Sequence, residues 1–458
     1  MIPSLPFVHF ARITIENTTP LSIGIGRGDG LQDALVVLDA NGFPALPGSS
    51  LAGVLRHLSE DSWGQKKTEQ LFGFVEDAGQ SSRLEVGWGH IHSGKDDPVC
   101  GLLGEDALQE DEILKTLIER PLPIREGVRI NGRGVAEDSG KFDRSYLAPG
   151  YRFSFDLLLW NEEASPDWKI LLELINSPSF RLGGMTHRGF GAFKMVRLLG
   201  GDFDLRNSDD LDRYSQISSF HSKCLQEIPI PQSPRVCHEI KLVLTPEPGG
   251  FLFGAGSIPM GSSSGKVADS LPLSEVHITW EEHGAVISKR RDIVIPASSV
   301  KGALAHRVAY HHNRLEGRFD DHALDAEDNP AVHELFGFAK NEEKASQPGR
   351  VWLDDIYLSV DGTKLKKQIH NSIDRFTGGV IKGALFSEEI VHDQRTFTMK
   401  CRIADKKYAN NVLKALKCSL DDLVQGRLAL GAGASRGHGY FQGTINWPEA
   451  LYEGKGIS

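Results

Sequence analysis

Two glycine-rich turns, residues 183–191 and 431–439, each hold an arginine among glycines: Arg188 in the first turn and Arg436 in the second. Glycines leave backbone amides open and let another backbone approach closely, so a cation among them is typical of an anion site. A phosphodiester chain is the natural ligand. The alternative is a plain tight turn between strands. Neither turn is a dinucleotide or P-loop fingerprint, because neither joins a strand to a helix or contains Gly-Lys-[Ser/Thr].

A second candidate feature is a serine pair before an apolar-faced segment. Ser49 and Ser50 precede a helix expected over 51–58, and Ser298 and Ser299 precede one expected over 300–311. A serine at this place usually caps the helix by accepting a hydrogen bond from a free backbone amide. The other interpretation is a phosphate site, in which the amides, a hydroxyl and a nearby Arg56 or Lys301 bind the anion.

A third cluster, His90, His92 and Cys100, has the residue types of a zinc site. The spacing matches no standard finger and a fourth ligand is not evident. Histidines that alternate along a strand share a face without any metal. We therefore expect no zinc here.

These features occur in an order that is repeated along the chain. Pro47–Gly53 matches Pro296–Gly302, and Leu71–Phe74 matches Leu335–Phe338. Segments 82–84, 129–134 and 186–191 match 349–351, 373–378 and 434–439. The first and last pairs have nearly the same separation, so whole domains repeat. Each copy reads strand, loop, helix, strands, helix, strand, which predicts an α+β fold. We expect a first domain over 1–200, a linker over 201–236, a second domain over 237–447 and a tail over 448–458.

Composition limits the class of protein. Hydrophobic residues make up 40% and charged residues 24%, as in ordinary globular proteins. No apolar run reaches membrane-spanning length and the N-terminus lacks a signal pattern, so we expect a cytoplasmic protein without a membrane partner. Five scattered cysteines without a CxxC pair indicate reduced thiols. The net charge of −10 weighs against indiscriminate nucleic-acid binding, so any such site must be a local groove.

The ordered motifs resemble the RAMP superfamily, whose members form the backbone of type III CRISPR effector complexes. The resemblance rests on four motifs: the Pro-Gly-Ser-Ser-Leu-x-Gly element, the Leu-Phe-Gly element, segment 371–378 leading to 383–389, and the terminal Gly-x-Gly-x-Ser-Arg-Gly-x-Gly turn. The resemblance covers about 45–198 and 239–443. The first copy departs from it at 185–188 and at 129–133, which puts its RNA contacts in more doubt than its fold.

The resemblance implies two tandem ferredoxin-like (RRM-like) domains with insertions that include a protruding thumb hairpin. It also implies guide (CRISPR) RNA, complementary target RNA and other CRISPR effector subunits as partners. Cleavage of target RNA in this family depends on a loop Asp before the strand that leads to the serine motif, and on a divalent metal, here Mg²⁺ or Mn²⁺. Asp33, before strand 34–38, and Asp269, in an Asp-x-x-Pro-Leu pattern, are therefore the catalytic and metal-ligating candidates, with Glu275 behind Asp269.

The motifs and the resemblance together give the candidate RNA-binding residues Ser49, Ser50, Arg56, Arg129, Arg133, His187, Arg188, Ser298, Ser299, Lys301, Arg375, Ser435 and Arg436. Two alternatives to an RNA-guided endoribonuclease remain open. One is a structural RAMP subunit that binds RNA without cutting it. The other is a guide-processing endoribonuclease, for which His9 or His57 would be the candidate residues, although duplication of the whole motif set argues against it.

Overall fold

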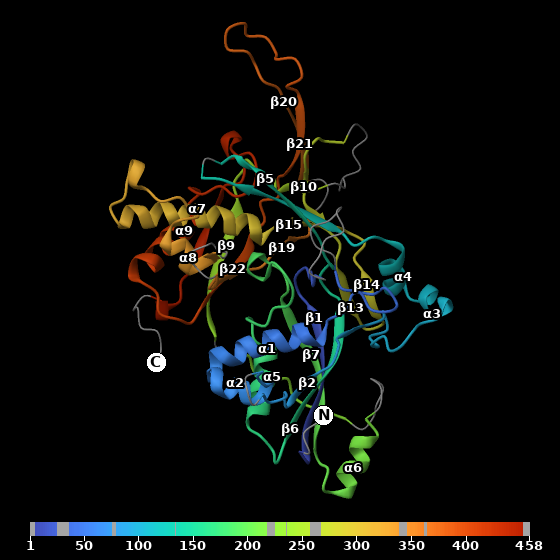
Figure 1. Ribbon diagram of the computed structural model, residues 1–458. Coiled ribbons are helices and arrows are strands. Elements are labelled where there is room, and N and C mark those ends of the chain that lie inside the picture. The colour runs from blue at the N-terminus through green and yellow to red at the C-terminus, as the bar shows by residue number, and fades with distance from the viewer. Residues whose placement is uncertain are drawn as a thin grey trace.

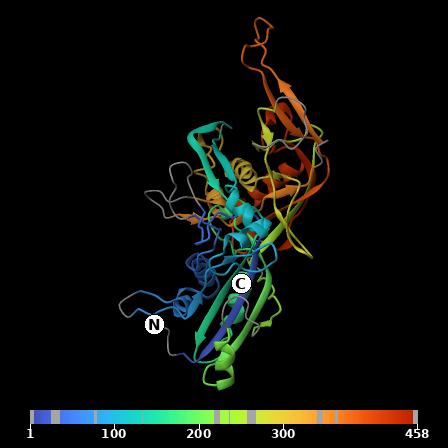
Figure 2. The same cartoon turned by 90° about the vertical axis from the view of Figure 1, so that its right-hand side faces the viewer.

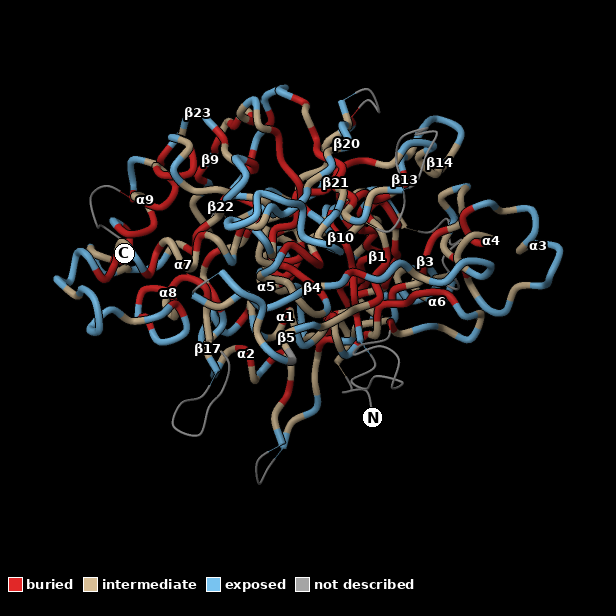
Figure 3. The backbone as a smooth tube through the Cα atoms, turned by 90° about the horizontal axis from the view of Figure 1, so that it is seen from above, coloured by how far each residue is buried: buried red, intermediate tan, exposed pale blue. Residues whose placement is uncertain are grey.

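The computed structural model describes residues 5–24, 36–75, 79–132, 134–217, 225–234, 236–256, 267–338, 346–360 and 364–451. Asp33 and Arg133 lie outside the described residues. The fold is a mixed α/β arrangement in which antiparallel sheets carry helices, and each half of the sequence contributes one larger sheet (Figure 1). Seen from above, buried backbone runs through the middle and exposed backbone forms the rim (Figure 3).

The first sheet is built around β1 (Phe7–Asn17), which pairs antiparallel with β6 (Arg152–Asn161) and β7 (Phe193–Asp204). Its order is β2-β6-β1-β7-β8, with β2 at Leu84–Val86 and β8 at Gln226–Glu227; β3 (His90–Ile91) also pairs with β6. The apolar sides of α1 (Gly48–Trp63) and α5 (Asp167–Ile175) share one core with the sheet. Helix α2 (Gln65–Phe72) follows α1.

The second sheet repeats this plan around β9 (Cys237–Pro246), in the order β18-β22-β9-β23. Its other strands are β18 (Val351–Leu353), β22 (Phe397–Ala404) and β23 (Phe441–Asn446). Helices α7 (Ala297–Leu315), α8 (Pro330–Phe336) and α9 (Asn410–Val424) complete a separate core.

Two long hairpins leave these cores. The first is β4 (Ile124–Ile130) with β5 (Ala136–Ser145), and the second is β20 (Leu365–His370) with β21 (Phe386–Val391). Figures 1 and 2 show the second hairpin projecting far from the body, whereas the first lies across the second half. At its tip, Ile130 accepts a hydrogen bond from His306 of α7 at 3.3 Å.

Smaller elements fill the loops. The strands are β10 (Gly254–Gly256), β11 (Leu271–Pro272), β12 (Ser274–Glu275), β13 (Ile278–Glu281), β14 (Gly284–Ile287), β15 (Asp292–Ile295), β16 (Gly337–Phe338), β17 (Gln347–Pro348) and β19 (Ile356–Leu358). The short helices are α3 (Glu105–Glu110), α4 (Glu112–Glu119) and α6 (Ser208–Ser215). Hairpin β13–β14 belongs to the second half by sequence, yet Ile278 and Trp280 pack on the first core.

Backbone hydrogen bonds repeat between the halves, which supports the duplication predicted from the motifs. The amide of Arg83 donates to Leu71 at 2.9 Å, and that of Arg350 donates to Leu335 at 2.8 Å. In the same way Ala45 donates to Val37, and Val294 donates to Leu273. Equivalent positions in the two halves can therefore be matched one by one.

Two expectations are corrected. Helices α1 and α7 begin earlier than predicted, with Pro47 and Pro296 as N-caps in extended conformation and with no side-chain cap. The serines thus lie in the first turn and do not cap, because Pro47 and Pro296 hold the N-cap position and fix the backbone just before each helix. The predicted linker 201–236 also holds ordered structure: it begins inside β7, where Phe203 is fully buried, and includes α6 and β8. The domain boundaries themselves stay a prediction. No helix in the described ranges is long and apolar enough to cross a membrane.

Candidate nucleic-acid interface

The two glycine-rich turns have the same backbone shape. Each contains one turn of 3₁₀ helix, η1 (Thr186–Arg188) or η4 (Ala434–Arg436). The left-handed φ angles of the first turn, at 83°, 59°, 96° and 74°, recur in the second at 85°, 81°, 85° and 81°. The residues concerned are Gly183, Met185, Gly189 and Gly191 in the first turn, and Gly431, Gly433, Gly437 and Gly439 in the second. Seven of these eight are glycines, which explains why the motif is so rich in that residue.

The first turn packs against the second half of the chain. A Cβ on Gly189 would lie 2.6 Å from both the Cβ of Ala297 and Oδ1 of Asp355, so only glycine fits. The His187 ring stacks on Trp352 of β18, with ring centroids 5.6 Å apart. Burial, together with the charges of Lys301 and Arg181, lowers the pKa of His187 to about 4, so its ring is neutral at pH 7. His187 therefore acts here as a packing group.

A cluster of positive charge forms where η1 meets α7. Desolvation and the like charges of Arg129 and Arg144 lower the pKa of Arg188. Burial and the charge of Arg188 lower the pKa of Lys301 to about 8. Three of these cations come from the first half and Lys301 comes from the second. Like charges held together in this way favour an anion between them. We call Arg129, Arg144, Arg188 and Lys301 the junction cluster.

Counter-charges are few around the junction cluster. Among the described residues, no ion pair involves Arg188, Arg144 or Lys301, and the Lys301 ammonium donates to the carbonyl of Phe336 at 2.9 Å. Arg129 is weakly paired, at 3.5 Å from both Glu137 and Glu327. The Arg188 guanidinium lies 5.8 Å from the centre of the Phe142 ring.

The second turn differs in its electrostatics. Arg436 donates two hydrogen bonds to Glu388, at 2.7 and 3.2 Å, and Glu388 is buried. His370 lies 2.9 Å from the same carboxylate. The cation of the second turn is therefore already neutralised by a carboxylate on β21. Its neighbour Ser435 lies in η4, whose residues are exposed.

The helix N-termini also differ. In α7 the first amide, that of Ala297, donates to Asp355 at 2.7 Å, so a carboxylate already occupies that helix end. Ser298 and Ser299 lie in the turn that follows. Ser49 and Ser50 hold the same positions in α1, where Gly48 packs so closely on Val86 that a Cβ would lie 2.3 Å from the Val86 oxygen.

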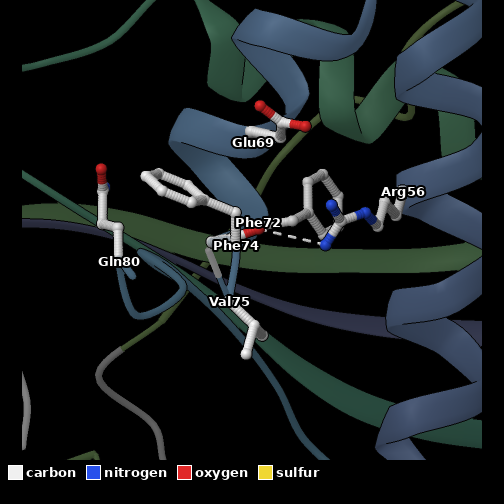
Figure 4. A pocket seen from close by; sticks show the side chains of 7 residues that line it. Arg56, Glu69, Phe72, Phe74, Val75 and Gln80 are labelled. Atoms are coloured by element: carbon white, nitrogen blue, oxygen red, sulfur yellow. Dashed lines mark hydrogen bonds between the residues drawn. The ribbon is translucent and has the colours of Figure 1, made fainter. Parts of the chain in front are cut away.

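Arg56 lies in α1 beside a pocket formed with the end of α2. Its guanidinium donates to the Gly73 carbonyl at 3.1 Å (Figure 4). It also approaches Glu60 of the same helix at 3.4 Å. Arg375 lies at the far end of the second hairpin and is exposed, next to Phe376, which is 96% exposed. Neither arginine joins the junction cluster.

The two catalytic candidates occupy matched places in the sequence. Val37 and Leu273 are equivalent because they make the same backbone hydrogen bonds. Their amides donate to the carbonyls of Ile23 and Phe253, and their carbonyls accept from the amides of Ala45 and Val294. Asp33 and Asp269 each lie four residues before them. The carboxylate of Asp269 accepts from the amide and hydroxyl of Ser387, at 2.8 and 2.9 Å, and the residue is exposed.

Glu275, the reserve candidate, is not available for catalysis. It is 2% exposed, forms an ion pair with Arg125 and accepts from Tyr146 and Tyr357 at 2.8 and 3.0 Å. Its role is to anchor the base of the first hairpin.

The expected divalent metal finds no ready-made site in the part of the chain described. No group of three or more His, Cys, Asp or Glu residues there is placed to hold an ion. His92 is hydrogen-bonded to Asp96 at 2.8 Å and to Ser154 at 2.7 Å. Asp269 itself offers one carboxylate, which already accepts hydrogen bonds from Ser387, so no chemical step is derived through a metal.

Some functional candidates were missed in the sequence. Arg144 belongs to the junction cluster but carries no motif, and only its place in the strand that pairs with the strand of Arg129 could have indicated it. Arg125, Arg181, Asp354 and Asp355 join the halves, and the sequence gives no signal for that contact.

The match to a protein-family model follows the same division into halves. The family model described as the RAMP superfamily matches residues 14–194 and 273–442. A CRISPR system Cms endoribonuclease Csm3 of Methanocaldococcus jannaschii is 27% identical over 184 residues, which are 35% of this chain and 68% of the relative. A chain in the cryo-EM structure of the Type III-B Cmr-beta bound to cognate target RNA matches with 15% identity and a TM-score of 0.30, over 42% of this chain and 60% of that one. This chain thus spans less than two thirds of that structural neighbour.

The family model covers well over half of the sequence and matches each half separately, as the motif pairs predicted. The chain belongs to the RAMP superfamily.

Proposed function

We propose that this chain is a backbone subunit of a type III CRISPR effector that holds guide RNA by its phosphates and cleaves complementary target RNA. Other subunits of the effector would be its protein partners. The observation that carries the proposal is the junction cluster, in which the two halves gather four cations beside a turn rich in backbone amides. A single-stranded RNA backbone supplies the anions that such a cluster lacks.

Each half is proposed to be a ferredoxin-like unit. The strand orders β2-β6-β1-β7 and β18-β22-β9-β23 are the same: when the four strands of each sheet are numbered in chain order, both read 2-3-1-4. In both, a helix follows the first strand and another precedes the last. This arrangement supports the tandem fold implied by the motifs.

The first half is proposed to hold the RNA more firmly than the second. Arg188 has only like charges as close electrostatic neighbours, whereas Glu388 neutralises Arg436. A phosphate beside Arg188 gains a cation without displacing a partner. A phosphate beside Arg436 has to compete with a buried carboxylate, which is costly to leave unpaired. This reverses the expectation from the motif departures.

Cleavage of target RNA is proposed to depend on Asp33 and Asp269. Two observations support this: the relative from Methanocaldococcus is named an endoribonuclease, and the two aspartates have equivalent places before matched strands. A carboxylate there would position the ribose hydroxyl or its proton for attack on the next phosphate. Mg²⁺ or Mn²⁺ is proposed as the cofactor, since Asp oxygens suit hard cations.

One observation favours the structural alternative for the second half. Asp269 is tied to the start of β21 by both hydrogen bonds from Ser387, as in a loop whose carboxylate serves the backbone. Asp269→Asn keeps the size of the side chain, so a second half that only binds RNA would tolerate it in a cleavage assay.

The proposal is tested by measuring guide-RNA affinity for the wild type and for Arg188→Ala over a range of salt concentrations. Each phosphate contact adds about 0.7 to the slope of log affinity against log salt for single strands. Loss of Arg188 should lower the slope by about that amount, with the same effect on guides of unrelated sequence. An unchanged slope would mean that Arg188 does not contact RNA phosphate and that the first turn has only a structural role.

A further inference from the structure

The contact between the two halves depends on a set of buried charges. Arg125, at the base of the first hairpin, pairs with Glu275 and Asp355 of the second half, and all three are buried. Arg181, just before the first glycine-rich turn, donates to Asp354 at 2.6 Å and is 4% exposed. Two arginines of the first half thus meet three carboxylates of the second.

These charges satisfy one another within the junction. Asp355 also accepts from the first amide of α7, and Asp354 also binds Arg402 of the second sheet. Burial opposes the charge of Arg125, but Asp355 and Glu275 outweigh it and hold its pKa well above the usual value. Removing Arg125 would leave the buried carboxylates of Glu275 and Asp355 without a counter-charge, and removing both carboxylates would leave Arg125 without one, so the contact requires both sides.

The first half lacks the carboxylates at the equivalent places. Leu84–Val86 of β2 corresponds to Val351–Leu353 of β18, since Arg83 and Arg350 make the same hydrogen bond just before them. Beyond these strands, Gly89 pairs with Leu46 as Ile356 pairs with Ile295. The two residues between are Asp354 and Asp355 in the second half, and Gly87 and Trp88 in the first. Trp88 is 50% exposed.

The second half lacks the arginines in turn. Leu182 and Leu430 make the same hydrogen bonds to Gly191 and Gly439, so Ala429 stands where Arg181 stands.

The hairpin registers complete the comparison. Leu21 pairs with Leu147 as Phe251 pairs with Val391, which aligns β5 with β21. In the first hairpin Arg125 pairs with Arg144, which lies three residues before Leu147. In the second hairpin Gln368 pairs with Glu388, which lies three residues before Val391, so Gln368 is at the position of Arg125. Gly437 has open space where Gly189 touches Asp355. The second turn therefore has the shape of the first, but it lacks the preceding arginine and the contact with a carboxylate.

We propose that this charge set is a specificity device that joins the two halves of one chain and rejects a second copy of the chain. A second copy added by the same contact would present Gln368 and Ala429 to Gly87 and Trp88. No ion pair forms there, and nothing replaces the carboxylate that caps α7. This inference concerns protein contacts alone and does not depend on RNA binding or cleavage.

The test measures molecular mass by sedimentation of nuclease-treated protein, from micromolar to near-millimolar concentration. We expect the wild type to stay monomeric. Two double variants transplant the charge set: Gly87→Asp with Trp88→Asp on the first half, and Gln368→Arg with Ala429→Arg on the second. A Cβ on Gly87 meets its nearest atoms at 3.4 Å, which is ordinary contact. Each double variant alone should be monomeric, and their mixture should form a dimer that high salt dissociates.

The matched control replaces Gly87 and Trp88 with Asn, which keeps the size of the side chains and removes the charge. It should not bind the arginine variant. Two results would overturn the proposal. One is wild-type protein that associates with cross-links from the Trp88 face to the second glycine-rich turn. The other is a mixture of the two charged variants that remains monomeric at every concentration. Either leaves the RNA-binding proposal standing, because no RNA is present.

Discussion

Replacing Lys301 with methionine should make the RNA-free protein more stable while weakening its hold on RNA. The pKa of Lys301 is lowered from 10.5 to about 8 by burial and by Arg188. At roughly 1.4 kcal/mol per pKa unit, this corresponds to about 3 kcal/mol of destabilisation of the folded state while the ammonium is charged. Methionine removes that charge at similar length.

Some of this gain is offset. Methionine also removes the hydrogen bond from the Lys301 ammonium to the Phe336 carbonyl, which costs about 1 kcal/mol. The net increase in the free energy of unfolding at pH 7 is therefore about 2 kcal/mol. Lys414, exposed on α9, supplies the control, since Lys414→Met should change stability by less than about 0.5 kcal/mol.

The effect of Lys301→Met on stability should depend on pH in one direction. Below pH 8, both the folded and unfolded states carry the Lys301 proton, and the destabilisation is complete. Between about pH 8 and 10.5 the unfolded state binds more protons than the folded state, so wild-type stability rises with pH through this group. The advantage of Lys301→Met should therefore be largest at pH 7 and shrink toward pH 10.

The assay is urea denaturation of wild type, Lys301→Met and Lys414→Met at several pH values, with RNA affinity measured against salt in parallel. We expect Lys301→Met to have a larger free energy of unfolding than the wild type, and its log affinity for RNA to depend on log salt with a slope lower by about 0.7. A Lys301→Met protein that is less stable than wild type at pH 7, or that binds RNA with the wild-type slope, would refute the junction cluster as an anion site.

Three further outcomes are expected. Arg436→Ala should lower the salt slope for RNA less than Arg188→Ala does, because Glu388 already neutralises Arg436; equal effects in the same titration would contradict this. Arg125→Ala should destabilise the protein by about 3–5 kcal/mol, since it leaves buried carboxylates unpaired, whereas Gln368→Ala, at the equivalent position, should cost little in the same denaturation experiment. EDTA should stop cleavage of a labelled target and added Mg²⁺ or Mn²⁺ should restore it; full activity after chelation would rule out the metal.

The duplication was predictable because its signals are local. Backbone turns with left-handed φ angles favour glycine at fixed positions. Because both halves contain the same turn, glycine recurs at the same positions in both sequences. The order of strands and helices follows from short-range patterns for the same reason.

The start of the serine-motif helices was mispredicted because two local signals compete. Serine suits a cap, but Pro47 and Pro296 already fix the entry of the chain, so the helices begin directly after them. The start of the linker was mispredicted because Gly200 and Gly201 interrupt the apolar pattern of β7, whose buried side chains are Met195, Leu198 and Phe203.

The site was only half predictable. Arg188, Arg129 and Lys301 stood in motifs, but that they meet depends on how one half packs on the other. Arg144 joins them through the hairpin base, and the neutralisation of Arg436 depends on Glu388, which is distant in sequence. Contacts of this kind leave no periodicity or spacing that a single sequence could show.

The most direct test of the proposed activity is cleavage of an end-labelled complementary target by guide-loaded complexes containing wild type, Asp33→Ala, Asp269→Ala or the double variant. Guide and target binding, measured in parallel, should be the same in all four. The account predicts that each single variant loses a different product band and that the double variant loses both, because equivalent sites far apart act independently. A double variant that produces every band at the wild-type rate would contradict it.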